Sequence, residues 1–328
     1  MSHCANQPQK VVITDYGFEN TELERHILEP LGYKLTTLKA GKDRALIDLV
    51  RDADAVITQF APVNAEVIEA MEKCRGIVRY GIGVDNVDIA AAAAKGIPVC
   101  NVPDYCIDEV ADHTLALLLA LTRRVVPNHK LVSGGGWGLA GAVDSLKSLK
   151  YLTVGLVAFG RIGREVAARL APFKCRILVF DPAMSPEALR QAGVEPTGFD
   201  DLLAASDVIS LHCPTTPKTR GMINAAVFEK MKQGALLVNA SRGELVVTDD
   251  LLAALHSGRI AGAALDVTSP EPLPPDHPLR TAENVVISPH VAAYSLKAIH
   301  NLRSTVAGIA ASVLRGEIPP NIVNGVVL

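Results

Sequence analysis

The chain has 328 residues, of which 49% are hydrophobic and 20% charged, and its formal net charge at pH 7 is -3. This length is sufficient for two domains with separate cores, and the near balance of charge excludes a global basic field that would hold nucleic acid or anionic lipid. No apolar run is long enough to span a membrane, and the polar N-terminus lacks the apolar core of a signal peptide.

Short strands and helices alternate in the first hundred residues. The apolar, β-branched runs predict strands at Lys10–Thr14, Tyr33–Thr37, Ala55–Thr58, Gly76–Arg79 and Pro98–Cys100. The segments between them predict helices at Glu19–Leu28, Ala65–Met71 and Asp88–Lys95. Such alternation is typical of a parallel sheet that is covered by helices on both faces. A long apolar helix, Ile107–Arg124, follows, with acidic residues in its first turn and arginines in its last.

The alternation starts again after a glycine-rich stretch, Ser133–Gly138, which we interpret as a connecting arm. Further strands are predicted at Thr153–Ala158, Arg176–Phe180, Val208–Leu211, Ala235–Asn239, Ala261–Val267 and Val285–Ser288. A helix is predicted at Arg161–Leu170, and a final long helix at Ser295–Arg315. The fold class is therefore α/β, with two doubly wound parallel-sheet units in one chain.

A glycine-rich turn lies between the strand at Thr153 and the helix at Arg161. Gly160 and Gly163 match the last two glycines of a dinucleotide-binding turn, and Ala158 replaces the first. The next strand ends in Asp181, and an acid at this position accepts hydrogen bonds from an adenosine ribose and repels a 2′-phosphate. A tight turn without a ligand is the alternative, but this context predicts binding of NAD rather than NADP.

Three later motifs each follow a predicted strand or its loop, and they offer a guanidinium (Arg242), a carboxylate (Glu271) and an imidazole (His290). A 2-oxo acid that is reduced by hydride needs a bidentate cation for its carboxylate and a proton donor that titrates near neutrality. Each residue alone could be structural: an arginine in a surface turn, a solvated loop acid, or a hydrogen-bonded histidine. Together, at strand ends where such folds bind ligands, they predict a nicotinamide-dependent dehydrogenase.

Several motifs carry a resemblance to a known family. They are Gly160–Gly163, Asn239–Gly243, Asp266-Val267, Glu271-Pro272, Pro289-His290, Val78–Ile89 and Gly96–Pro103. The chain resembles the D-isomer-specific 2-hydroxyacid dehydrogenases over nearly its whole length, and within them the branch that contains the C-terminal-binding-protein corepressors and their bacterial relatives. The resemblance implies a Rossmann NAD-binding domain, residues 104–295, inserted into a discontinuous flavodoxin-like substrate domain, residues 1–103 and 296–328.

The resemblance also implies roles for single residues. His290 would be the acid/base, Glu271 its partner and Arg242 the clamp for the substrate carboxylate. The loop that ends the strand at Arg79 would bind the same carboxylate through Tyr80, Gly81, Ile82 and Gly83. The cofactor contacts would be Thr114, Gly160, Arg161, Ile162, Asp181, Cys213, Ala240, Ser241, Arg242, Asp266 and His290. The protein would form a homodimer through the cofactor domain, with the arm Gly134–Leu149 and Trp137 as a contact.

The corepressors carry an aromatic residue where this chain has Ala293, so their preferred substrate does not transfer directly. The loop Gln59–Pro62 lacks Lys and Arg, which favours an unphosphorylated substrate, although Arg79 could supply the missing charge. Residues expected on the substrate side are Gln59, Phe60, Tyr80, Tyr105 and Tyr294. His113 is expected to be a packed helical residue. Two rival functions stay open: an NAD(H)-sensing scaffold and a formate- or phosphite-type dehydrogenase.

The six cysteines, Cys4 among them, are scattered and show neither disulfide nor metal-binding spacing. We therefore expect reduced thiols, no metal and a cytoplasmic location.

Overall fold

The computed structural model describes residues 8–38, 44–143, 146 and 148–326. Cys4, both ends of the predicted substrate domain and part of the predicted arm lie outside these residues. Contacts between Cα atoms divide the chain into two compact units: Met1–Tyr105 with Ser295–Leu328, and Cys106–Tyr294. Among the described helices, none combines the length and the hydrophobicity needed to cross a bilayer.

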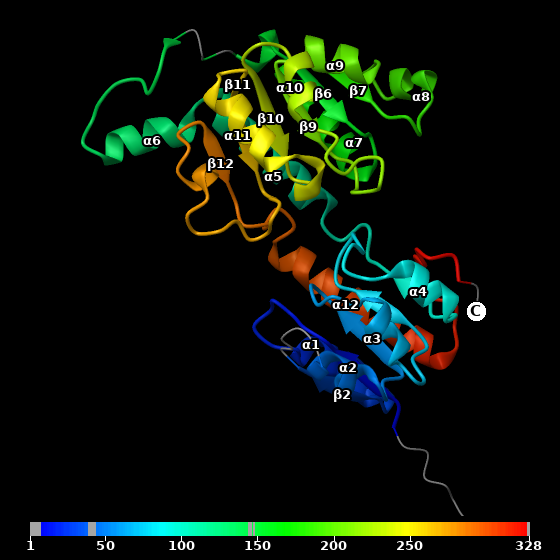
Figure 1. The fold of residues 1–328 in the computed structure, drawn as a ribbon. Coiled ribbons are helices and arrows are strands. Elements are labelled where there is room, and N and C mark those ends of the chain that lie inside the picture. Colours follow the sequence, from blue (N-terminus) through cyan, green and yellow to red (C-terminus); the bar gives the residue numbers. More distant parts are fainter. Residues whose placement is uncertain (1–7, 39–43, 144–145, 147, 327–328) are drawn as a thin grey trace, which may run out of the picture. The chain divides into compact units, whose positions relative to one another are not determined.

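The first unit is a five-stranded parallel sheet (Figure 1). Its strands, in spatial order, are β2 (Lys34–Thr37), β1 (Lys10–Ile13), β3 (Ala55–Thr58), β4 (Ile77–Arg79) and β5 (Val99–Cys100). This is the 2-1-3-4-5 order of flavodoxin-like sheets. Its helices are α1 (Glu22–Leu28), α2 (Arg44–Val50), α3 (Ala65–Glu69), α4 (Ile89–Ala94) and α12 (Leu296–Arg315). The flavodoxin-like order that the family resemblance implied is thus confirmed.

Two apolar clusters hold this sheet between its helices. Residues of α1 and α12, such as Leu28 and Leu302, pack on one face. Residues of α2, α3 and α4, such as Leu46 and Ile68, pack on the other. The strands β1, β3, β4 and β5 contribute to both clusters and are buried from both sides, which explains their continuous apolar runs. The edge strand β2 contributes Leu35 to the first cluster. The helix α2 was not predicted, because its seven residues bury only two side chains and give a weak periodic signal.

The second unit is a seven-stranded parallel sheet. In spatial order its strands are β12 (Val285–Ile287), β11 (Ile260–Leu265), β10 (Ala235–Asn239), β9 (Val208–Leu211), β6 (Thr153–Val157), β7 (Arg176–Phe180) and β8 (Glu195–Pro196). The first strand of the unit, β6, lies next to the fourth, β9, so the direction of winding reverses between them. This is the Rossmann order with one added strand, and such sheets bind ligands outside the strand ends at that reversal.

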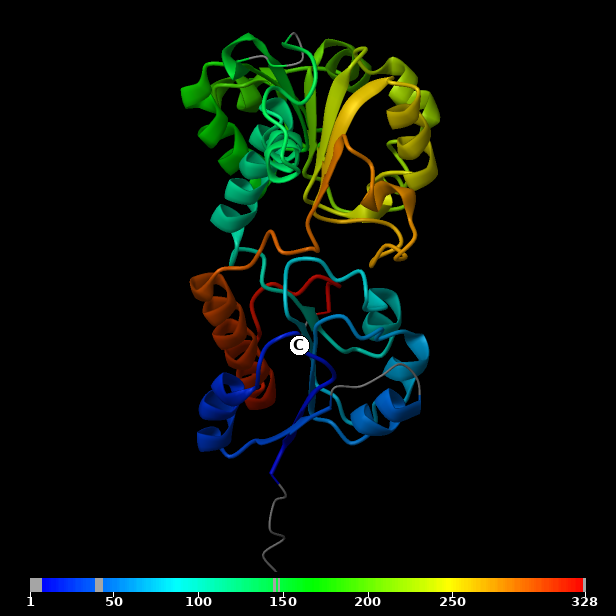
Figure 2. The same ribbon diagram turned by 90° about the vertical axis from the view of Figure 1, so that its left-hand side faces the viewer.

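Helices cover both faces of the second sheet (Figure 2). One face carries α5 (Ile107–Thr122), α7 (Arg161–Leu170) and α8 (Pro186–Gln191). The other carries α9 (Phe199–Ala205), α10 (Ala225–Lys230) and α11 (Thr248–His256). The predicted pair of doubly wound parallel sheets is confirmed.

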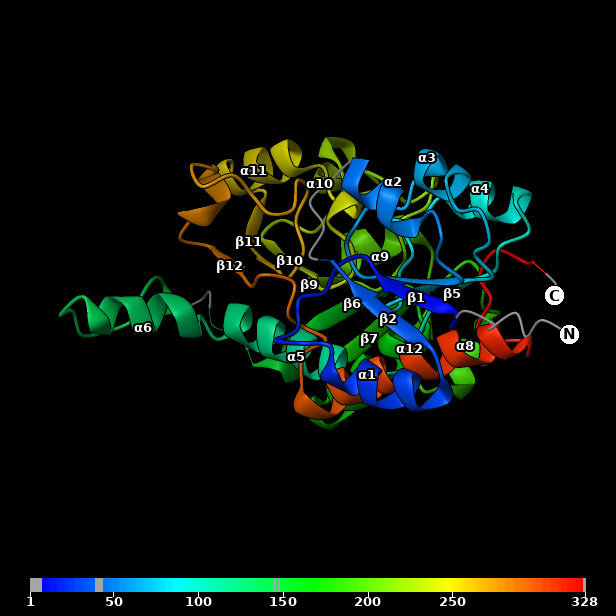
Figure 3. The ribbon, with the colours of Figure 1, turned by 90° about the horizontal axis from the view of Figure 1, so that it is seen from below.

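The segment after α5 differs from the prediction. The helix predicted at Ile107–Arg124 ends at Thr122, because Arg124 adopts a left-handed conformation with φ of 50°. Arg124 instead precedes a second helix, α6 (Val125–Ser133), which projects from the rest of its unit (Figure 3). None of the nine described residues of α6 is buried.

Candidate active site

The glycine-rich turn lies between β6 and α7. The N–H of Ala158 donates to Phe180 O over 2.8 Å, and Ala158 has φ of 76°, a conformation that costs a non-glycine residue about 1 kcal/mol. An ideal Cβ on Gly163 would lie 2.6 Å from Ala158 O, so only glycine allows α7 to pack this closely. The turn therefore tolerates Ala158 but requires Gly163.

Asp181, at the end of β7, holds this turn in place. Its carboxylate accepts hydrogen bonds from the N–H groups of Phe159 and Ala183, each at 2.8 Å. These contacts fix the acid beside the start of α7. Each carboxylate oxygen has a second lone pair, so the side chain can still accept hydrogen bonds from a ribose.

The turn fits the phosphates of a dinucleotide. Apart from Gly160 and its two chain neighbours, no described residue has an atom within 4 Å of an ideal Cβ on Gly160, so the space over this residue is open. Arg161, the first residue of α7, is exposed, and the helix N-terminus adds free N–H groups and a favourable dipole for phosphate. The side chain of Ser241 donates to Cys213 O over 2.5 Å and so joins the loops after β10 and β9.

Asn239 organises the loop that carries Arg242. Its side chain is buried; Oδ1 accepts from Ser241 N over 3.0 Å and Nδ2 donates to Arg242 O over 2.8 Å. The guanidinium of Arg242 donates to Ser241 O over 2.7 Å. The sequence motif contained Asn239, but we had assigned it no role; a buried amide at a strand end, two residues before a polar turn, was the available signal.

His290 and Glu271 are hydrogen-bonded at the carboxyl ends of the strands. His290 Nδ1 lies 2.6 Å from Glu271 Oε1, and Glu271 Oε2 accepts from Thr268 N over 3.1 Å. Burial raises the pKa of Glu271, but the hydrogen bond and charge of His290 and the Thr268 N–H outweigh it, so this pKa lies below its ordinary value. An ionised Glu271 only accepts hydrogen bonds, so His290 Nδ1 is the donor and Nε2 is left for a substrate.

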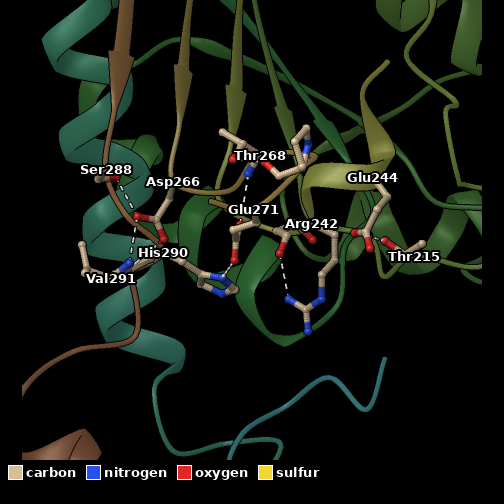
Figure 4. Close-up of polar contacts among 12 residues, drawn as sticks. Thr215, Arg242, Glu244, Asp266, Thr268, Glu271, Ser288, His290 and Val291 are labelled. Carbon is tan, nitrogen blue, oxygen red and sulfur yellow. Dashed lines mark hydrogen bonds and ion pairs between the residues drawn. The ribbon is translucent and has the colours of Figure 1, made fainter. Parts of the chain in front are cut away.

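Figure 4 shows Glu271 between His290 and Arg242, with all three side chains beyond the tips of the strands. The three predicted catalytic residues therefore come from loops that follow β10, β11 and β12 and gather on one edge of one sheet. An imidazole, its carboxylate partner and a guanidinium together can transfer a proton and bind an anion.

Asp266 lies behind His290. It is 1% exposed, and its carboxylate accepts from Ser288 Oγ at 2.6 Å, Val291 N at 3.0 Å and Ala292 N at 2.9 Å. The carboxylate thus points to the backbone of the His290 loop, and the predicted contact of Asp266 with the cofactor stays a prediction.

Two other predicted residues have buried side chains. Thr114 is 0% exposed, and its hydroxyl donates to Val110 O on its own helix over 2.7 Å. The hydroxyl of Tyr80 donates to the buried Glu24 over 2.9 Å, and burial, with the charge of Glu24, raises its pKa well above the ordinary value. Both side chains are therefore buried in the core, and the contacts predicted for Tyr80 and Thr114 with substrate or cofactor stay predictions. The half-exposed or exposed residues of the predicted set in this unit are Gly160, Arg161, Ile162, Asp181, Ala240, Ser241, Arg242, Glu271 and His290. Cys213 is buried.

In the first unit, the loop after β4 contains Gly81, with φ of 144°. An ideal Cβ on Gly81 would lie 1.6 Å from Arg79 Nη1, so the guanidinium of Arg79 packs directly over this glycine. The N–H of Gly81 already donates to Arg79 O over 2.9 Å. Gln59 is buried and accepts from Gly17 N over 2.6 Å, whereas Phe60 is exposed.

Comparisons with known proteins agree with this geometry. The family model described as D-isomer specific 2-hydroxyacid dehydrogenase, NAD binding domain, matches residues 115–292. A glyoxylate reductase of Korarchaeum cryptofilum is 42% identical over 290 residues, which cover 86% of this chain and 86% of that protein. A D-3-phosphoglycerate dehydrogenase of Archaeoglobus fulgidus is 39% identical over 289 residues, which cover 88% of this chain and 54% of that protein. The structure of a D-lactate dehydrogenase from Aquifex aeolicus, complexed with NAD and lactic acid, is 28% identical and covers 96% of this chain and 99% of that chain, with a TM-score of 0.87.

Proposed function

Because the chain belongs to the D-isomer-specific 2-hydroxyacid dehydrogenase family, we propose that His290, Glu271 and Arg242 carry its NAD-dependent interconversion of a 2-oxo acid and a D-2-hydroxy acid. The observation that carries this proposal is the 2.6 Å contact between His290 Nδ1 and Glu271 Oε1, close to the guanidinium of Arg242 (Figure 4). The contact leaves His290 Nε2 available for proton transfer.

A nicotinamide cofactor held at the glycine-rich turn would supply the redox chemistry, as NADH in reduction and as NAD in oxidation. The protein supplies the proton: His290 donates it from Nε2 to the carbonyl oxygen in reduction and removes it from the hydroxyl in oxidation. Glu271 stabilises the imidazolium through Nδ1. Arg242 binds the substrate carboxylate with two parallel N–H donors and polarises the neighbouring carbonyl. In the first unit, Tyr80, Gly81, Ile82 and Gly83 are proposed to contribute to substrate binding.

The residues that bind NAD are proposed on the same basis. Residues 104–295 form the NAD-binding domain, and residues 1–103 with 296–328 form the substrate domain; the compact units, which meet at Tyr105/Cys106 and Tyr294/Ser295, support this division. Contacts to the cofactor come from the residues on the loops after β6, β7, β9 and β10 and from His290; they are Gly160, Arg161, Ile162, Asp181, Cys213, Ala240, Ser241, Arg242 and His290. Thr114 and Asp266 belong to the same proposal, although their side chains also bind backbone groups or Ser288.

Asp181→Asn should change the choice of cofactor. The amide keeps one oxygen acceptor for the turn but removes the negative charge that binds the ribose hydroxyls and repels a 2′-phosphate. We expect kcat/KM with NADH to fall about tenfold or more and turnover with NADPH to rise, since a hydrogen bond to a charged group contributes about 1.5–3 kcal/mol. Steady-state kinetics with both cofactors measure this. Asp200→Asn, at an exposed acid on α9, is the control and should change neither value. An unchanged preference in Asp181→Asn would contradict the role of Asp181.

The substrate is proposed to be a small, unphosphorylated 2-oxo acid. The loop Gln59–Pro62 has no Lys or Arg, and one relative is named a glyoxylate reductase. The guanidinium of Arg79 over Gly81 favours the alternative of a second anionic group, such as a phosphate.

A substrate panel separates these possibilities. Reduction with NADH is measured with glyoxylate, hydroxypyruvate, pyruvate, phenylpyruvate, 4-methylthio-2-oxobutyrate and 3-phosphohydroxypyruvate, and oxidation with NAD is measured with formate and phosphite. We expect the highest kcat/KM with one of the small oxo acids. A preference for the phosphorylated acid would assign Arg79 to its phosphate. Turnover of formate or phosphite alone would reject the oxo-acid proposal, and NADH-dependent partner binding without any turnover would favour a scaffold.

A homodimer through the arm Gly134–Leu149 is also proposed. Trp137 is 92% exposed and Val143 is 78% exposed, and solvent-exposed apolar groups on a projecting segment are typical of an interface. Trp137 is the chain's single tryptophan, so its fluorescence reports on the arm alone. On dilution we expect its emission to shift to the red as the dimer dissociates. Sedimentation should show that Val143→Asp weakens the dimer, whereas Leu296→Asp, at an exposed residue of the other unit, does not. A monomer at all concentrations would reject the proposal.

We place the protein in the cytoplasm, which the free thiols of Cys74, Cys100, Cys106, Cys175 and Cys213 support.

A further inference from the structure

A second hydrogen-bonded network lies behind His290 within the same unit. We infer that His113, on α5, is a positioning residue that acts through Ser288 and Asp266 on the backbone of His290. This inference rests on the proposed role of His290 as the acid/base. It assigns a function to a histidine that the sequence had suggested was only packed in its helix.

The direction of the hydrogen bonds follows from the single proton of the Ser288 hydroxyl. Ser288 Oγ donates that proton to Asp266 Oδ1 over 2.6 Å. His113 Nε2 lies 2.9 Å from the same Ser288 Oγ, so the ring nitrogen must be the donor in this pair. His113 Nε2 also lies 3.4 Å from Asp266 Oδ1, where a ring N–H is attracted to the carboxylate and a lone pair would be repelled. The chain of donors therefore runs from His113 to Ser288 to Asp266.

Asp266 connects this network to the loop of His290 through further hydrogen bonds. Its two carboxylate oxygens accept from the N–H groups of Val291 and Ala292, and its backbone O accepts from His290 N over 2.7 Å (Figure 4). Asp266 is 1% exposed, so its charge depends on these donors rather than on water. The loop that these bonds fix is unusual, because His290 has φ of 55°, a region that non-glycine residues rarely adopt.

The imidazole of His290 is thus held twice. Glu271 binds its ring through Nδ1, and Asp266 holds the backbone on which the ring is mounted. Without the N–H of His113, Ser288 Oγ loses its donor and the buried carboxylate loses part of its support, so the loop has more freedom. Proton transfer is sensitive to small displacements of the donor. The expected consequence is a lower rate of the chemical step with little change in ligand binding.

Four variants test this inference, with NADH and the best oxo acid of the panel. In His113→Leu we expect kcat to fall about tenfold, with the KM of the oxo acid and the Kd of NADH within about a factor of two of wild type. In His113→Gln the amide nitrogen replaces Nε2 as a donor and should restore most of kcat. Ser288→Ala should match His113→Leu. In the double variant His113→Leu/Ser288→Ala the effects should not add, because both act through one path.

Thr122→Val is the matched control on α5. Its hydroxyl donates only within the helix, to Leu118 O at 2.9 Å and Leu119 O at 3.4 Å, so its loss tests whether any buried change in α5 lowers kcat. Thermal unfolding and NADH binding of each variant show whether it is folded. If His113→Leu does not fold, the inference is still tested by the other two single variants: His113→Gln should keep most of kcat, and Ser288→Ala should lose it.

Three results would overturn the inference: wild-type kcat in His113→Leu, equal loss in His113→Gln and His113→Leu, or additive losses in the double variant. His290→Asn is measured in the same assay to separate the two levels of proposal. If His290→Asn keeps its turnover, the proposed acid/base is wrong. If it loses turnover while His113→Leu does not, only the positioning role of His113 is wrong.

Discussion

The His290→Asn variant should retain about one thousandth of the wild-type kcat, with NADH binding almost unchanged. Asparagine keeps a polar group near the Glu271 carboxylate but cannot donate and recover a proton, and general acid–base catalysis contributes roughly 10²–10⁴-fold to rate. Steady-state kinetics with the best oxo acid measure the loss, and NADH titration measures binding. A kcat within about tenfold of wild type would contradict the assignment.

The loss of kcat in His290→Asn is to be compared with the loss in Glu271→Gln. The amide can still contact His290 Nδ1, but it is neutral, so we expect a smaller loss, about 10- to 100-fold, since it removes only the support of the imidazolium. A loss in Glu271→Gln as large as in His290→Asn would mean that the carboxylate itself transfers the proton.

The proposed role of His290 determines in which direction the rate of the wild-type enzyme changes with pH. Reduction takes a proton from His290, so its rate should fall as the pH rises and the imidazolium is lost; oxidation needs the neutral ring and should show the opposite trend. The pKa of Glu271 is lowered in the folded protein. The carboxylate is therefore ionised at any pH above the ordinary glutamate pKa, and its pair with His290 is lost only as the pH falls through the lowered value. If His290 is the acid/base, the opposite pH trends of the two directions should disappear in His290→Asn.

Arg242→Lys should lower kcat/KM for the oxo acid by about 10³-fold. Lysine keeps the positive charge, but it lacks the planar pair of donors that binds a carboxylate bidentately. The loop of Arg242 is rigidly held, because Asn239 bonds both to Ser241 N and to Arg242 O, so a shorter reach cannot be recovered by a backbone shift. Both the KM of the oxo acid and kcat should change, since the clamp acts before and during hydride transfer.

The control for Arg242→Lys is Arg190→Lys, at an exposed arginine on α8 that should be neutral. The KM of NADH should change less than that of the oxo acid in Arg242→Lys. A variant with normal kcat/KM for the oxo acid, or one that loses only NADH binding, would show that Arg242 does not clamp the substrate.

Much of the fold could be predicted from local sequence. The structure has β3, β7, β9, β10 and α7 at the bounds that the sequence indicated. Each of these strands is a short apolar run that is buried on both faces and ends at polar residues or glycine, so the signal lies within the element itself. The elements β8 and α6 were not predicted, because neither gives a strong signal within its own sequence. The edge strand β8 has only two residues, and α6 buries none of its described residues.

In the candidate site, too, some features could be predicted from the local sequence and others could not. Arg242, Glu271 and His290 were predicted because each lies at a strand end or in the loop that follows a strand, and parallel strands bring their carboxyl ends to one edge. Membership of the branch close to the C-terminal-binding-protein corepressors stays a prediction. The side chains of Tyr80, Thr114 and Asp266 were assigned to ligands, but they are buried and bind other protein groups.

By itself, the sequence determined the class of fold, the dinucleotide turn with its terminal acid, and the three residue types of the reaction, because these features depend on neighbours along the chain. Only the tertiary structure decided which way each polar side chain points. Asp266 and Ser288 form a hydrogen bond although they lie 22 residues apart in the sequence, and Ser288 and His113 form one although they lie 175 residues apart. Hydrogen bonds are short and directional, so such partners can be identified only when the helix and the strands that carry them are packed together.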